Sequence, residues 1–206
     1  MLTFILSRYQ HMQPEAKNIT LYKQLVEGCL LNKRQAQYQL YELMSAKMFA
    51  VCMRYCSNKE YAQDILQEGF VKVFTNLDKF RWDGSFEGWV RRIFVNTAIE
   101  HFRKETKLFP VTDNETALMY YPVIDDLNHQ LELEDLLSLV QKLSTGYRTI
   151  FNMYVIEGYS HKEIAEMLKI SEGTSKSQLA RARYLLQKNI QEAHRIKLPH
   201  VANSGK

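Results

Sequence analysis

The sequence predicts an all-α protein with two helical domains joined by an acidic linker. Only eight glycines and four prolines occur among the 206 residues, fewer than turn-rich β-sandwiches and barrels use. Apolar residues recur at steps of three and four, and no segment alternates as a half-buried strand does. Between Pro110 and Asp135 there are seven acidic residues and no lysine or arginine. We therefore expect a helical bundle over 19–107, a linker over 108–130 and a four-helix, helix-turn-helix domain over 131–193.

The clearest helix of the N-terminal domain is predicted to begin at a capping box, Ser57-Asn-Lys-Glu60, which would satisfy free backbone amides at a helix start. One apolar stripe follows the box: Ala62, Ile65, Leu66, Gly69, Phe70, Val73, Phe74 and Leu77. Asp64, Gln67, Glu68 and Lys72 lie off this stripe, so we expect them to form an outward-facing polar edge. Further long helices are predicted around 40–51 and 86–104.

Four shorter helices are predicted for the C-terminal domain. The first two cover about 133–143 and 147–156, and a second capping box, Ser160 to Glu163, opens a third that ends near Lys169. Residues 171–173 form a short turn in which Gly173 is expected to take the positive φ of a sharp reversal. The last helix runs from about Thr174 to at least Ile190, which completes a helix-turn-helix pattern.

The last helix has the charge expected of a DNA-recognition helix. Its inner face is predicted to carry Leu179, Ala182, Leu186 and Ile190. Between 174 and 197 there are six lysines and arginines and only one acidic residue, Glu192. Cations bind phosphates, and small polar side chains near the helix N-terminus reach base edges in the major groove. A basic helix alone is more often a solvated face, but the capped helix and glycine turn before it favour duplex DNA.

A second cationic segment, 79–107, contains seven basic and four acidic residues with aromatic residues between them. We assign Trp89, Phe94 and Phe102 to packing, whereas Phe80 and Trp82 flank a loop where they are suited to capture an unstacked base. Stacking is worth about 1–3 kcal/mol per base, and a duplex step costs on average about 1.4 kcal/mol to unstack. Such capture can therefore hold open a few base pairs, and a larger opening needs a partner.

The sequence gives no sign of an enzyme, a metal site or a cofactor site. Its 46% hydrophobic and 24% charged residues are typical of a globular chain. Cys52 and Cys56 have no second Cys/His pair nearby, so we expect buried free thiols, as for Cys29, in a reducing cytosol. Zinc-protease, nucleophile-elbow and phosphate-loop motifs are absent. The first apolar run stops at Arg8, too short for a signal or spanning helix, so we expect a soluble cytoplasmic protein without membrane insertion.

Two long segments resemble one bacterial family. The run IEGYSHKEIAEMLKISEGTSKSQLARAR (156–183) closely resembles the promoter-reading C-terminal domain of extracytoplasmic-function (ECF) sigma factors. DILQEGF (64–70), followed by FEGWVRRIFVN (86–96), looks like the other domain of the same group. The resemblance implies core RNA polymerase and promoter DNA as partners, with an anti-sigma factor as a further candidate. It also implies that this chain performs no catalysis itself.

The resemblance implies a role for each candidate residue. Core polymerase would be bound by Asp64, Gln67 and Glu68. The −10 element would be bound by Lys79, Arg91, Arg92 and Asn96, with Trp82 or Phe80 stacking on a base. The −35 duplex would be bound by Lys176, Ser177, Gln178 and Arg181, with phosphates held by Ser160, His161 and Thr174 at helix N-termini.

The sequence departs from the family pattern at two positions, and other interpretations of the linker and of the whole chain stay open. Ser175 stands where an apolar residue is usual, at some cost in packing, and Gln178 stands where arginine is common and could pair with adenine instead. The linker is either a solvated loop or an acidic strap in a cationic channel of the polymerase. The chain could also be a helix-turn-helix regulator that binds palindromic DNA as a dimer, or an interaction adaptor with an incidental basic helix. The adaptor predicts no salt-dependent DNA binding.

Overall fold

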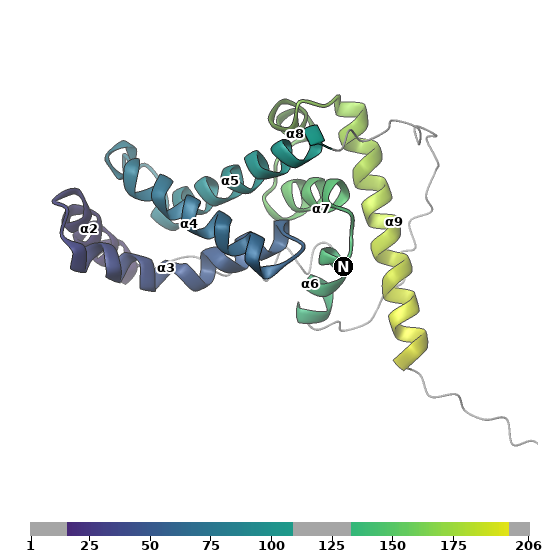
Figure 1. Cartoon of the computed structure of the whole chain (residues 1–206), viewed down its shortest axis with the longest axis horizontal. Coiled ribbons are helices and arrows are strands. Elements are labelled where there is room, and N and C mark those ends of the chain that lie inside the picture. Colours follow the sequence, from purple (N-terminus) through teal and green to yellow (C-terminus); the bar gives the residue numbers. More distant parts are fainter. Residues whose placement is uncertain (1–15, 109–132, 198–206) are drawn as a thin grey trace, which may run out of the picture.

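The computed structural model describes residues 16–108 and 133–197, and every regular element in these ranges is helical (Figure 1). The predicted all-α fold class is therefore confirmed. The predicted linker lies outside the described residues apart from Leu108, the last residue of a helix, and so does the first apolar run of the chain. Among the described helices, none combines the length and the apolar character that a membrane span requires.

The N-terminal domain contains α2 (Ala16–Leu30), α3 (Arg34–Tyr55), α4 (Lys59–Thr75), the short 3₁₀ helix η1 (Leu77–Lys79) and α5 (Phe86–Leu108). Helices α3, α4 and α5 pack against one another, and α2 packs on α3. Gly69 allows the close approach of α4 to α5, because a Cβ atom there would lie 2.3 Å from the Phe94 ring. The apolar stripe predicted for α4 is confirmed as its buried face, with only Phe74 partly exposed.

The two predicted capping boxes had different outcomes. The box at Ser57 was wrong by one residue, because Asn58 is the N-cap of α4 and its side chain accepts a 2.8 Å hydrogen bond from the backbone N–H of Tyr61. Asn and Ser are equally good N-cap residues, so the sequence alone could not show whether Ser57 or Asn58 begins the helix. The box at Ser160 is confirmed, because Ser160 Oγ accepts from the Glu163 N–H and a Glu163 carboxylate oxygen accepts from the Ser160 N–H.

The C-terminal domain contains α6 (Leu133–Gln141), α7 (Thr145–Phe151), which continues into the short π-helix η2 (Asn152–Ile156), then α8 (His161–Leu168) and the long α9 (Glu172–Lys197). Helix α9 packs against α6, α7 and α8 (Figure 1). It begins at Glu172, two residues earlier than predicted, so Gly173 lies inside its first turn. The predicted positive φ at Gly173 was therefore wrong: Lys169, the C-cap of α8, makes the reversal with φ 57°.

The two domains pack together at the C-terminal end of α3. The last carbonyls of a helix have no partner within it, and here side chains of the C-terminal domain supply that partner. Arg148 Nε donates to the Tyr55 carbonyl (3.2 Å), Gln141 Nε2 to the Met53 carbonyl (3.1 Å) and Asn152 Nδ2 to the Arg54 carbonyl (2.6 Å). The buried apolar side chains of both domains form one continuous cluster.

The three cysteines have free thiols and are buried in this cluster, as expected. Burial raises the pKa of Cys52 to about 12, with a smaller contribution from Cys56. A thiol with so high a pKa is protonated at neutral pH and a poor nucleophile. Across 16–108 and 133–197 there is no group of three or more metal-ligating side chains.

Candidate nucleic-acid and polymerase interfaces

The predicted inner face of α9 is buried, which leaves the opposite face to solvent. Leu179, Ala182, Leu186 and Ile190 are all buried in the core. On the other side, the Lys176 side chain is 62% exposed, and its nearest acid is Glu172 at 3.7 Å. The Arg181 guanidinium lies 5.5 Å from the Tyr184 ring centre. The helix therefore presents cations on the face that points away from its own domain.

The first turn of α9 is organised by hydroxyl groups. Ser171 Oγ accepts a 3.0 Å hydrogen bond from the Thr174 N–H and lies 2.8 Å from Thr174 Oγ1. Ser177 Oγ donates to the Thr174 carbonyl at 3.1 Å. Gln178 is partly buried beside α7, where a Cβ atom at Gly146 would lie 3.4 Å from its amide oxygen. Among the predicted −35 residues, Lys176 and Ser160 are thus exposed, whereas Gln178 is partly buried beside α7.

A contact between His161 and Ser175 joins the N-termini of α8 and α9. Ser175 is fully buried, and its Oγ lies 2.9 Å from His161 Nδ1. The imidazole stacks on Tyr154 with ring centres 4.4 Å apart. Burial, together with the positive charges of Lys176 and Arg183, lowers the pKa of His161 below its ordinary value. Ser175 therefore has a polar partner in place of the apolar packing that its position usually provides.

Of the two arginines predicted for −10 DNA, Arg91 is held by the C-terminal domain. Its Nε and one terminal nitrogen donate to the two carboxylate oxygens of Glu157 at 2.9 and 3.0 Å. Arg54 of α3 contacts the same carboxylate at 3.4 Å, and the Glu157 side chain is only 8% exposed. Arg92 is exposed and lies beside Tyr159. Burial raises the pKa of Tyr159, and the positive charge of Arg92 partly opposes this shift. Asn96 lies half-buried further along α5.

The loop before α5 holds its aromatic residues in one cluster. Trp82 stacks on Phe86 at 5.8 Å between ring centres and meets Phe80 edge-on at 4.9 Å. Trp82 has φ 63°, a left-handed conformation that is costly for a bulky residue. The rings of both Phe80 and Trp82 remain partly exposed, and Lys79 is exposed with its Nζ bonded to Asn76. Of the three aromatics assigned to packing, Phe94 is buried, while Trp89 and Phe102 are partly buried against the core.

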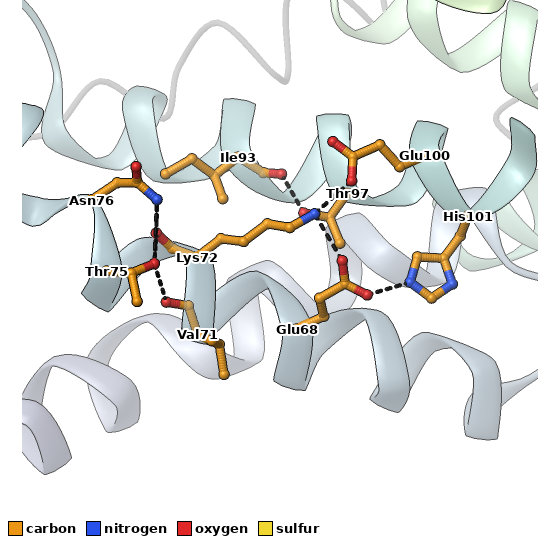
Figure 2. Close-up of polar contacts among 9 residues, drawn as sticks. All are labelled: Glu68, Val71, Lys72, Thr75, Asn76, Ile93, Thr97, Glu100 and His101. Carbon is orange, nitrogen blue, oxygen red and sulfur yellow. Dashed lines mark hydrogen bonds and ion pairs between the residues drawn. The ribbon is translucent and has the colours of Figure 1, made fainter. Parts of the chain in front are cut away.

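The polar edge of α4 is linked to α5 by a charged network (Figure 2). Glu68 bonds Lys72 at 2.8 Å and His101 at 2.6 Å, and Lys72 also bonds Glu100 at 2.7 Å. The hydrogen bonds from Lys72 and then His101 lower the pKa of Glu68 to about 2. Asp64, by contrast, is exposed, as is Gln67. The three predicted polymerase-binding residues thus share one helix face, but the Glu68 carboxylate is already bound within the chain.

Several residues that organise these surfaces were missed in the sequence. The Glu68–Lys72 pair has the four-residue spacing of a helical ion pair and could have been identified. His101, Glu157 and Arg148 act on residues 33 to 103 positions away. No local pattern identifies such partners in a single sequence.

Two family models match the chain. The model described as Sigma-70 region 2 matches residues 40–108, and the model described as Sigma-70, region 4 matches residues 133–186. The first match covers the predicted −10 and polymerase-binding residues and the second covers the helix-turn-helix. The acidic segment lies between them.

Individual proteins are also similar to the chain. The ECF RNA polymerase sigma factor SigW of Bacillus subtilis is 27% identical over 183 residues, covering 84% of this chain and 98% of its own. The RNA polymerase sigma-H factor of Pseudomonas aeruginosa is 27% identical over 180 residues, covering 82% and 93%. Among solved structures, the sigma factor RpoE in complex with the anti-sigma factor NepR from Bartonella quintana is 22% identical, with a TM-score of 0.46 and coverage of 75% and 96%. The chain belongs to the ECF group of RNA polymerase sigma factors.

Proposed function

We propose that this sigma factor binds core RNA polymerase in the cytoplasm and holds two promoter elements with its two domains. The domain over 19–107 binds polymerase and the −10 element, and the domain over 131–193 binds the −35 element. The chain supplies binding and specificity, and the catalysis belongs to the polymerase. The observation that carries the proposal is a helix-turn-helix with an exposed cationic face, preceded in the chain by a region 2 match.

The −35 surface is assigned to the exposed side of α9 and the N-termini of α8 and α9. Lys176 and Arg181 supply positive charge for phosphate or guanine, and Ser177 and Gln178 supply smaller polar groups. Helix N-termini favour anions because their free N–H groups and dipoles point at the ligand. Ser160, His161 and Thr174 lie at these termini, which supports their assignment to DNA phosphates.

The −10 surface is assigned to the loop before α5 and the first half of α5. Lys79 and Arg92 are exposed to solvent, where their charges are available to phosphates. The strained backbone at Trp82 fits a loop shaped for ligand binding, since such strain concentrates at functional sites. Arg91 contributes once it leaves Glu157, and Asn96 completes the set.

Polymerase docking is assigned to the outward edge of α4. Asp64 and Gln67 are exposed there and lie about one helical turn apart, since an α-helix has about 3.6 residues per turn. Glu68 completes the edge, and its bonds to Lys72 and His101 fix its position relative to α5. An anti-sigma factor is a further partner that we expect from the family.

The deciding experiment combines core-polymerase binding with transcription. The purified full chain should be retained by immobilised core enzyme and should direct run-off transcription from a cognate promoter. Asp64→Lys should abolish retention, whereas Lys176→Ala should preserve retention and weaken promoter binding. Binding to palindromic DNA as a dimer without polymerase would favour the regulator instead. Failure to bind core enzyme would remove the sigma proposal.

A further inference from the structure

The His161–Ser175 contact joins α8 to α9 and also bears on which nitrogen of the His161 ring carries the proton. His161 is the first residue of α8 and Ser175 is the fourth residue of α9, so their 2.9 Å contact is a direct bond across the helix-turn-helix. Ser175 is fully buried, while His161 is partly exposed. One end of this hydrogen bond is therefore in the core and the other reaches the proposed DNA surface.

The burial of Ser175 determines which atom donates. Two other helical hydroxyls donate to a backbone carbonyl: Thr97 donates to Ile93 and Ser177 donates to Thr174. Within the described residues, the side chain of Ser175 has one hydrogen-bond partner, His161 Nδ1. A buried hydroxyl hydrogen without an acceptor is costly. The Ser175 hydroxyl therefore donates, and Nδ1 accepts.

The surroundings of the ring favour its neutral form. Lys176 and Arg183 of α9 and burial of the ring lower the pKa of His161, and Glu172 of α9 only partly opposes them. From η2, Tyr154 covers one face of the imidazole, and the Arg183 guanidinium lies 5.7 Å from the centre of the Tyr154 ring. A neutral imidazole carries one N–H. With Nδ1 accepting, that N–H is at Nε2.

We propose that Ser175 is a positioning residue for promoter binding: its hydroxyl holds His161 in the Nε2–H tautomer, and that N–H donates to a DNA phosphate at the N-terminus of α8. The proposal rests on the assignment of His161 to the −35 surface. It gives Ser175 a role that an apolar residue cannot fill, because an apolar side chain leaves the tautomer of His161 unselected. The stack on Tyr154 sets the plane of the ring, and Ser175 sets which nitrogen carries the proton.

The tautomer can be measured without DNA. Long-range ¹H–¹⁵N spectra of the full chain labelled at histidine distinguish a protonated ring nitrogen from an unprotonated one, and loss of a signal in His161→Asn assigns the residue. Ser175→Thr and Ser175→Val form a matched pair, because threonine and valine have nearly the same shape and only threonine keeps the hydroxyl. We expect an accepting Nδ1 and a protonated Nε2 in the wild type and in Ser175→Thr. A protonated Nδ1 in the wild type, or an unchanged spectrum in Ser175→Val, overturns the proposal.

A double-mutant cycle then tests the link to DNA. With core polymerase and a promoter fragment, we expect Ser175→Val to weaken binding about three- to tenfold, as loss of one hydrogen bond would, and Ser175→Thr to restore it. In a His161→Ala background, Ser175→Val should have no further effect, because Ser175 acts through His161. If Ser175→Val weakens promoter binding by the same factor with and without His161, the positioning role is overturned. Loss of promoter binding by the wild type itself, with the expected tautomer intact, would instead overturn the sigma function.

Discussion

Glu68, which we propose as part of the polymerase-docking edge, also contributes to stability through its bonds to Lys72 and His101. Its pKa, about 2 in the folded chain, lies below the ordinary value of 4.5 because Lys72 and His101 stabilise the charged form. A lowered folded-state pKa stabilises the protein above the unfolded-state pKa, and this contribution is lost as pH falls from about 4.5 towards 2.

We expect Glu68→Gln to lower the free energy of unfolding near neutral pH by no more than about 1 kcal/mol, because partly exposed charges are screened by solvent. The difference from the wild type should shrink below the unfolded-state pKa. Urea unfolding of both proteins over a series of pH values measures it. Glu100→Gln is the control, because Glu100 bonds only the Lys72 end of the network in Figure 2 and should change stability less. A difference that persists unchanged into acid would contradict the assignment.

Arg181 is the residue whose removal most directly tests the −35 surface. If it contacts a base edge, Arg181→Ala should cost about 1–3 kcal/mol and relax specificity at one position. If it contacts a phosphate, binding should weaken for all sequences and the salt slope should fall by about one. Promoter affinity of the polymerase complex over a salt titration separates the two. Lys188→Ala, about two turns further along α9 and paired with Glu192, is the control. Unchanged affinity at every salt concentration would remove Arg181 from the surface.

At the scale of helices, the sequence predicted buried faces better than it predicted ends. The inner faces of α4 and α9 follow from apolar periodicity, which is repeated over several turns and so survives an error at one residue. A cap depends on one side chain, and Ser57 and Asn58 both qualify for α4. The turn before α9 failed for a related reason: Gly173 is suited to positive φ, but the α8 C-cap falls on Lys169.

The correction at this turn has a measurable consequence. Lys169 adopts a left-handed conformation that glycine takes without penalty, so Lys169→Gly should stabilise the chain by about 1 kcal/mol or less. Glu166→Gly, in the interior of α8, should instead destabilise it by about 1 kcal/mol. Thermal unfolding of both variants measures these opposite shifts. Gly173→Ala is a further check, because an added Cβ meets nothing closer than 3.6 Å. Marked destabilisation there would mean that Gly173, and not Lys169, needs the unusual backbone.

At the scale of the whole molecule, the two domains were predictable but their packing was not. Two stretches of helical periodicity, separated by an acidic segment without lysine or arginine, can be recognised in the sequence. The interface instead depends on single side chains, such as Arg148 and Asn152, that reach the free carbonyls of α3 more than 90 positions away. Glu157 is buried between Arg54 and Arg91 in the same way. The polymerase, −10 and −35 roles of individual residues stay predictions until they are tested on DNA and polymerase.

If Arg91 binds −10 DNA, as we propose, domain packing and −10 binding compete for the same arginine. Both carboxylate oxygens of Glu157 accept hydrogen bonds from Arg91, whose guanidinium is therefore occupied while the domains are packed. Removing one partner of a buried ion pair costs about 3–5 kcal/mol, so Glu157→Gln should loosen the domain interface. It should also remove the carboxylate that competes with DNA for Arg91.

Two variants make this competition testable. Glu157→Gln and Arg91→Ala should both increase the radius of gyration measured by small-angle scattering, because each breaks the same contact. Their effects on single-stranded −10 DNA should be opposite: Glu157→Gln should strengthen binding, since the Glu157 carboxylate no longer competes with DNA for Arg91, and Arg91→Ala should weaken it. Lys47→Ala breaks the Lys47–Glu87 pair inside the N-terminal domain and should change neither quantity. If Glu157→Gln opened the interface but left −10 binding unchanged, Arg91 would have no part in binding DNA and its role would be confined to holding the domains together.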